Sequence, residues 1–180
     1  YGTMSTLASI RNSINTTDEF YDKENDYFDT VGPIFQGLNV EYYKALISSK
    51  FRKQLEEKYG AQLFKLAEME IKTFSDEVLE DLQEENKLVS QYNKLVASAK
   101  IEFQGQIRNL SQMTPFKQDK DRNVRKEATE KSNAFFEEHE SEFDEIYDKL
   151  VKVRTKIAQK LGYKNFVELG YLRMARSEYG

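Results

Sequence analysis

The sequence predicts a mainly α fold, a multi-helix bundle that carries one β-hairpin at about residues 98–110. Apolar residues recur at the helical spacings i, i+3, i+4 and i+7 through most of the chain. Only 2 prolines and 8 glycines interrupt its 180 residues, and so low a content suits long helices. One short stretch instead alternates apolar and polar residues, which is typical of strands.

Composition indicates a folded domain and excludes several functions. The chain is 39% hydrophobic and 32% charged, as in ordinary globular proteins. Its net charge of −4 gives no general attraction to nucleic acid, and no apolar run is long enough to span a membrane. The absence of cysteine excludes disulfides. We expect residues 1–180 to form a single helical domain, and both ends resemble cuts through structure, as in a fragment of a larger protein.

The first elements should be two helices separated at Gly32-Pro33. Thr16 and Glu19 have capping-box spacing, so a helix should start near Thr17. Gly32-Pro33 should bend or end this helix, and Asn39 can cap the next one. The apolar positions of the two helices are Phe20, Tyr27, Phe28, Val31, Tyr42, Tyr43, Leu46 and Ile47.

Two further helices should precede the hairpin. One begins after Gly60 and carries an apolar face, and the other begins at Ser75-Asp76-Glu77, where acidic residues favour a helix N-terminus. The apolar positions are Leu63, Phe64, Ala67, Ile71 and Phe74 in the first, and Val78, Leu82, Val89, Tyr92 and Val96 in the second.

The segment 98–110 predicts the hairpin. Ile101 and Phe103 alternate with polar neighbours, the dipeptide Gln104-Gly105 favours a turn, and Ile107 follows on the second strand. Pro115 and the polar stretch 117–121 should then form a loop.

One long helix is expected from Asp121 to Leu161. Gly162 suits the position after its C-terminus, and Asn165 with Glu168 can cap a short final helix. The apolar positions of the long helix are Phe143, Ile146, Tyr147, Leu150, Val151, Ile157, Ala158 and Leu161, of which Ile146, Leu150 and Ile157 are expected in the core.

The stretch HESEF at 139–143 resembles a zinc-peptidase helix without matching it. H-E-x-x-H requires a second histidine at position 143, which is Phe143, and phenylalanine cannot bind zinc. The chain has one histidine and no cysteine, so no His/His pair or cysteine cluster can form. A diiron Glu-x-x-His motif fails as well, because position 136 is Phe136. The simplest interpretation is a helical histidine beside apolar neighbours.

The remaining polar features have ordinary interpretations. The acidic run 137–145 could be a cation site or contact a basic partner, and the basic series Lys149, Lys152, Lys156 and Lys160 could meet an anion. Both are more simply solvated helix faces. Gln83 and Asn86 lie between Leu82 and Val89, so one of them must approach the apolar face. They could line a cavity or make a structural contact inside the bundle.

The order of segments resembles the N-terminal part of the oligoendopeptidase F group. This group belongs to the thimet-oligopeptidase-like family of zinc metallopeptidases. The resemblance covers nearly all of the chain, and its most specific phrases are DR-x-x-R-x-x-A (Asp121, Arg122, Arg125, Ala128) and LGY-x-N-F (Leu161, Gly162, Tyr163, Asn165, Phe166).

The resemblance implies a largely helical wall or lid over a channel that admits short peptides, in a cytoplasmic metalloendopeptidase. The family's zinc ligands lie downstream of LGY-x-N-F, so zinc would belong to the full-length enzyme and this chain would have no metal or catalytic residue. Its partner would be the catalytic domain of the same polypeptide, and Gln83 and Asn86 are candidates to face the channel. The alternative is a free-standing, dimerising helical interaction module.

Overall fold

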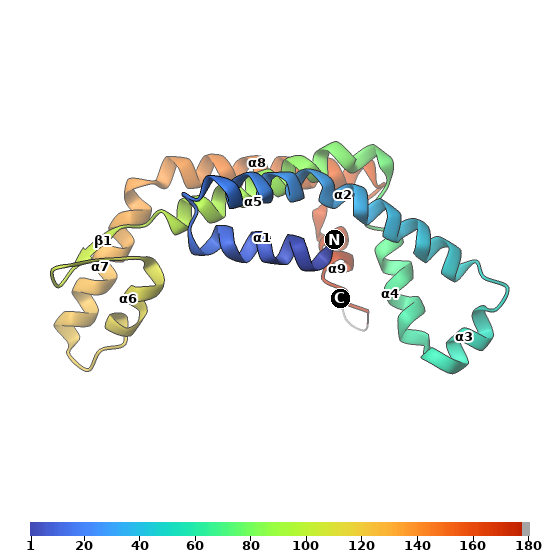
Figure 1. The fold of residues 1–180 in the computed structure, drawn as a ribbon, viewed down its shortest axis with the longest axis horizontal. Coiled ribbons are helices and arrows are strands. Elements are labelled where there is room, and N and C mark those ends of the chain that lie inside the picture. The colour runs from blue at the N-terminus through green and yellow to red at the C-terminus, as the bar shows by residue number, and fades with distance from the viewer. Residues whose placement is uncertain (178–180) are drawn as a thin grey trace. The chain divides into compact units, whose positions relative to one another are not determined.

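The computed structural model describes residues 1–177, which form nine α-helices, one 3-10 helix and one hairpin (Figure 1). This confirms the mainly α fold with a single hairpin. The elements are α1 (Gly2–Ile14), α2 (Glu19–Ile47), α3 (Arg52–Tyr59), α4 (Ala61–Ile71), η1 (Asp76–Val78), α5 (Leu79–Ala97), β1 (Ile101–Phe103), β2 (Gln106–Arg108), α6 (Leu110–Lys117), α7 (Arg122–Glu138), α8 (Glu140–Lys160) and α9 (Phe166–Arg173).

Residue contacts divide the chain into two compact units. Unit 1 comprises Tyr1–Asp26 and Lys87–Leu150, and unit 2 comprises Tyr27–Asn86 together with the chain from Val151 onward. Helices α2, α5 and α8 therefore contribute residues to both units. Whether the two units fold together as the single domain expected from the sequence stays a prediction.

The core of unit 1 forms where the hairpin meets α6 and α7 (Figure 1). The strands are antiparallel, and both residues of the Gln104-Gly105 turn have positive φ, as a tight two-residue hairpin requires. The alternation in the sequence places one face of β1 inward. The buried cluster consists of Ile101, Phe103, Met113 and Ala128.

Helix α6 replaces the first part of the loop expected around Pro115. Asn109 and Gln112 form a reciprocal capping box, with Oδ1 of Asn109 accepting from the N–H of Gln112 at 2.8 Å. Met113 is fully buried in the hairpin core. These two contributions offset the one backbone hydrogen bond that Pro115 removes, so only residues 118–121 connect α6 to α7.

The DR-x-x-R-x-x-A phrase has a structural role at the start of α7. Asp121 caps the helix by accepting from the N–H of Asn123 at 2.8 Å. Arg125 donates to the carbonyls of Asp119 and Lys120, at 2.7 and 2.9 Å, and so ties the preceding loop to the helix. Ala128 has no exposed surface in the hairpin core.

The single helix expected from Asp121 to Leu161 is two helices, which corrects the prediction. His139 ends α7, with φ −104° and ψ 14°, and its carbonyl accepts from the N–H groups of Glu142 and Phe143 in α8. No glycine or proline lies at this junction, so the sequence carried no break signal. Gly162 has φ +86° after α8, which confirms its predicted place.

The core face of α8 is narrower than its apolar pattern suggested. Leu150 and Ile157 are buried as predicted, and Ile146 is half-buried. Tyr147 is 71% exposed and Val151 is 48% exposed, so their assignment to the apolar face was wrong.

Helix α2 runs unbroken past Gly32-Pro33, so the predicted separation was wrong. Asn39 lies inside this helix and caps nothing. The N-terminus is close to the expected position, but its cap is Asp18, whose Oδ1 accepts from the N–H of Phe20 at 3.0 Å. Of its 29 residues only Pro33 and Val40 are buried.

In unit 2, α3 and α4 form a helical hairpin, and α4 contacts α9. Helix α4 follows Gly60 as predicted, and α5 follows the short helix η1 at Asp76–Val78. The fully buried side chains of this unit include Phe64, Ala67, Val78, Ile157, Ala158 and Leu169. Within the described part of the chain, every helix is too short or too polar to cross a bilayer.

Candidate functional site

Gln83 and Asn86 both hold α5 to α2 through side-chain amides. Nε2 of Gln83 donates to the carbonyl of Thr30 at 2.6 Å, and Nδ2 of Asn86 donates to the carbonyl of Asp29 at 3.0 Å. Both side chains are half-buried. The structure thus gives them a bundle contact, and their contact with a peptide stays a prediction.

The contact of Asn86 offsets part of the cost of Pro33 inside α2. In an uninterrupted helix the carbonyl of Asp29 accepts from the N–H of residue 33, and proline has no N–H. Asn86 supplies a donor to that carbonyl from the neighbouring helix. A part-buried carbonyl that has one donor fewer weakens the helix, so Asn86 of α5 partly compensates for the proline in α2.

Asp81 is a buried carboxylate held by two lysines of α8. Its side chain is 3% exposed, Oδ1 lies 2.6 Å from Nζ of Lys156, and Oδ2 lies 2.5 Å from Nζ of Lys160. Burial alone would raise the pKa of Asp81, but the hydrogen bonds and the charges of the two lysines together outweigh burial and hold that pKa below its usual value. The same contact raises the pKa of Lys156.

Glu85 lies one helical turn further along α5 and is held by two arginines. Its side chain is 4% exposed, with Oε1 2.7 Å from Nε of Arg154 and Oε2 2.9 Å from Nη1 of Arg173. Asp81 and Glu85 are separated by four residues, so they share one face of α5. We call this set of six side chains, completed by Lys156 and Lys160, the α5 acid cluster.

The LGY-x-N-F phrase supports this cluster. The Phe166 ring lies 5.6 and 5.7 Å from the guanidinium carbons of Arg154 and Arg173, within cation–π distance. The Tyr163 hydroxyl donates to the carbonyl of Lys72 at 3.1 Å, and burial raises the pKa of Tyr163. Asn165 caps α9, as predicted. The phrase therefore anchors α9 and orients two arginines toward Glu85.

Sequence reasoning missed the α5 acid cluster. Lys156 and Lys160 are exposed, as the predicted solvated face requires, but both also reach the buried carboxylate of Asp81. A signal existed, because Glu85 lies seven residues after Val78 and four before Val89, in phase with the apolar positions.

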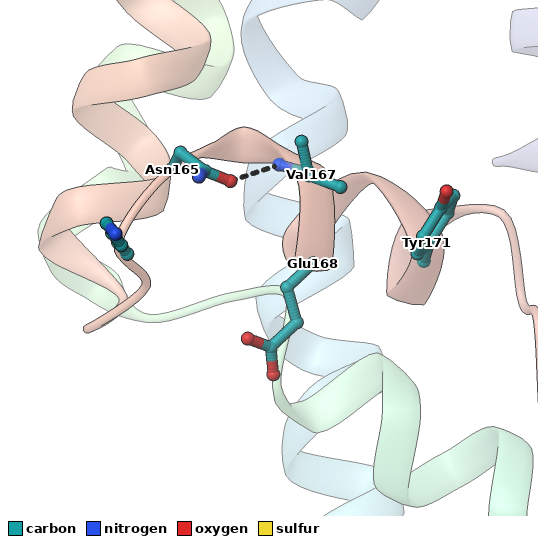
Figure 2. A pocket seen from close by; sticks show the side chains of 5 residues that line it. Asn165, Val167, Glu168 and Tyr171 are labelled. Carbon is teal, nitrogen blue, oxygen red and sulfur yellow. Dashed lines mark hydrogen bonds between the residues drawn. The ribbon is translucent and has the colours of Figure 1, made fainter. Parts of the chain in front are cut away.

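A shallow depression of ≈ 430 Å³ lies on α9 (Figure 2). Figure 2 shows that Oδ1 of Asn165 is engaged by the N–H of Val167, at 3.0 Å. The depression is also lined by Lys164, Glu168 and Tyr171. These groups form no pairing of nucleophile and base, so the depression has no evident chemistry.

Across residues 1–177, no three histidine, cysteine or acidic side chains gather closely enough to hold a metal ion. His139 Nδ1 lies 2.8 Å from Oε1 of Glu142, and its ring lies 4.8 Å from that of Phe135. The contact with Phe135 agrees with the apolar neighbourhood expected for HESEF, but His139 lies at the turn between α7 and α8 and not within a helix, which corrects that part of the prediction. The described residues therefore do not fit a catalytic zinc ion.

The sequence profile of the peptidase M3 N-terminal domain matches residues 1–74. No curated protein matches the chain. Three solved structures do. PZ peptidase A, determined with an inhibitor, is 60% identical with a TM-score of 0.94 over 99% of this chain and 32% of its own. A Bacillus anthracis strain Ames protein described as an oligoendopeptidase F is 59% identical with a TM-score of 0.94. The match covers 99% of this chain and 33% of that protein.

A third structure, also described as an oligoendopeptidase F, is 53% identical with a TM-score of 0.95 over 100% of this chain and 32% of its own. The chain thus spans about a third of the length of each relative. The match with the N-terminal domain profile agrees with this partial coverage. The chain matches an N-terminal segment of oligoendopeptidase F-like proteins of the peptidase M3 family.

Proposed function

We propose that this chain is the substrate-confining part of a zinc-dependent endopeptidase that cleaves short peptides in the cytoplasm. The observation that carries the proposal is identity of 53–60% with oligoendopeptidase F-like proteins over essentially the whole chain. Identity of this degree supports a shared activity of the full-length protein.

Zinc and the reacting groups belong, in this proposal, to the part of the enzyme outside residues 1–180. The described residues offer no ligand set for zinc, so no catalytic step is assigned to them. Their contribution is steric. A rigid helical wall excludes bulky folded chains from a channel and admits short, extended peptides.

The partner of this chain is accordingly the catalytic domain of the same polypeptide. Gln83 and Asn86 remain the candidate channel residues, although both amides already donate to α2. Changing Gln83 to Ala in the full-length enzyme should raise KM for a short peptide more than it lowers kcat if the side chain faces substrate. An unchanged KM with a lowered thermal midpoint assigns Gln83 a purely structural role.

The test of the function is direct. The reading frame should continue beyond Gly180 into an H-E-x-x-H helix, and the full-length protein should cleave a quenched fluorescent peptide. A chelator should abolish cleavage, and zinc should restore it. As a matched control, changing the glutamate of that motif to Gln should remove activity without removing zinc. A frame that ends near Gly180, or a full-length protein that cleaves equally well with chelator, would overturn the proposal.

A further inference from the structure

Helix α2 is apolar on two opposite sides. Its buried side includes Pro33 and Val40, the latter 1% exposed. The other side carries Tyr27, Ile34, Leu38 and Tyr42, which are 57, 47, 61 and 63% exposed. We call these four residues the α2 stripe, and α2 can be followed as the long blue helix of Figure 1.

The α2 stripe is one continuous face. Its residues are separated by seven, four and four positions, which at about 100° per residue keeps all four within roughly 80° of one another around the helix. Val40 lies on the far side by the same geometry. Single exposed apolar side chains are ordinary, but four in register over about 22 Å of helix are a mark of an interaction surface.

A groove of ≈ 390 Å³ runs beside the α2 stripe and widens the apolar surface. Ile34 and Leu38 line it from α2, and Phe74 and Leu79 line it from the chain before and within α5. Gly37 makes this shape possible, because a Cβ there would lie 3.1 Å from the Phe74 ring. The ring can therefore lie against the helix backbone.

The charges at the rim of the groove are already neutralised in part. Nζ of Lys44 lies 2.7 Å from Oε1 of Glu41, and both side chains are more than half exposed. Asp76 also lines the groove, so an occupant needs mainly an apolar face and would meet this carboxylate as well. An apolar helix face has this chemistry and can follow a stripe about four turns long.

We propose that the α2 stripe and its groove are covered by an apolar helix face from the part of the full-length protein outside residues 1–180. The length of the relatives supports this occupant. The chain spans only 32–33% of each relative, so about two-thirds of such a protein lies outside this chain and is available to pack against it. The inference rests on the proposed function and adds to it the surface through which the segment joins the enzyme.

The test is cysteine protection in the full-length protein. Residues 1–180 contain no cysteine, so Leu38→Cys and Tyr42→Cys each introduce one thiol in that segment. Any cysteines elsewhere are first replaced by serine, and retained peptidase activity is verified. Val40→Cys serves as the protected reference and Lys126→Cys, whose parent side chain is 71% exposed, as the free reference. We expect the two stripe thiols to react with a maleimide at least about tenfold more slowly than the thiol at 126.

Each result decides between occupants. Protection that is unchanged on dilution and in the absence of peptide supports the proposal. Protection that is lost on dilution assigns the surface to a second copy of the protein. Protection that appears only with a saturating peptide assigns it to substrate. Either result overturns the proposal. Free reaction of both stripe thiols in an active, zinc-containing enzyme also overturns it, while leaving the proposed function intact. The proposed function is tested separately, because the absence of zinc-dependent cleavage by the unmodified enzyme would contradict it.

Discussion

Asn86 donates its side-chain amide to the carbonyl of Asp29 at 3.0 Å, the carbonyl whose helical donor Pro33 cannot provide. The pair lies within unit 2 and joins α5 to α2. A polar residue of one helix thus makes a proline tolerable in another.

Changing Asn86 to Ala should therefore lower the free energy of unfolding of the chain by about 1–3 kcal/mol, because a partly buried carbonyl loses its donor. Urea denaturation followed by circular dichroism measures the change. In the Pro33→Ala background, the alanine N–H supplies that donor, so the same change should cost less than about 1 kcal/mol. Equal costs in the two backgrounds would show that the amide acts in another way.

Changing Asp81 to Asn should lower the free energy of unfolding of the chain at neutral pH and should make that free energy depend less on pH in the acid range. The folded pKa of Asp81 is lowered, so its stabilisation is fully present above its ordinary pKa near pH 4 and is lost as pH falls toward the folded pKa. We expect a loss of about 1–3 kcal/mol at pH 7, since both lysines remain partly hydrated. Denaturation midpoints between pH 2 and 7 measure both effects, and a variant with the parental acid slope would contradict the assignment.

Changing Arg173 to Ala should loosen α9. The variant leaves Glu85 with Arg154 alone and removes one guanidinium from the Phe166 ring. Amide hydrogen exchange in residues 166–173 should accelerate, whereas exchange in α6 and α7 of the other unit should not. Arg122→Ala, at the first position of α7, is the matched control. Unaltered exchange in α9 would mean that the arginine contributes nothing to holding this helix.

Changing Leu150 to Ala should cost about 2–5 kcal/mol, because the side chain is buried in α8. Tyr147→Ala on the same helix is the control, and its 71% exposed ring should make the change worth less than about 0.5 kcal/mol in the isolated chain. Thermal or urea unfolding of the two variants side by side measures the difference. Similar losses for both would mean that the core face of α8 has been assigned wrongly.

Local chemistry allowed much of the fold to be predicted from sequence. The hairpin followed from the alternation of Ile101 and Phe103 and from a dipeptide suited to positive φ. Gly162 and Asn165 were placed correctly, because a helix end and a helix cap each depend on one residue and its immediate neighbours. The absence of a zinc-binding motif likewise follows from residue types alone.

Errors arose where a distant segment overrode a local signal. Gly32-Pro33 was predicted to end a helix because the donor to the Asp29 carbonyl, Asn86 in α5, lies 57 residues away in the sequence. Lys156 and Lys160 are exposed as predicted, but their contact with Asp81 was not predicted, because Asp81 lies 75 or more residues earlier in the chain. The same distance hid the α5 acid cluster, the best-defined polar arrangement in unit 2.

The sequence by itself determined the helical class, the hairpin, the Asn165 cap of α9 and the resemblance to a peptidase family, because these depend on residue type and short spacing. Only the tertiary structure decided which polar residues are buried and which apolar ones remain in water. Asp81 and Glu85 are buried because cations of α8 and α9 reach them, and Leu38 and Tyr42 are exposed because nothing in residues 1–177 covers that side of α2. Burial is a property of pairs of segments, and one segment read alone cannot specify it.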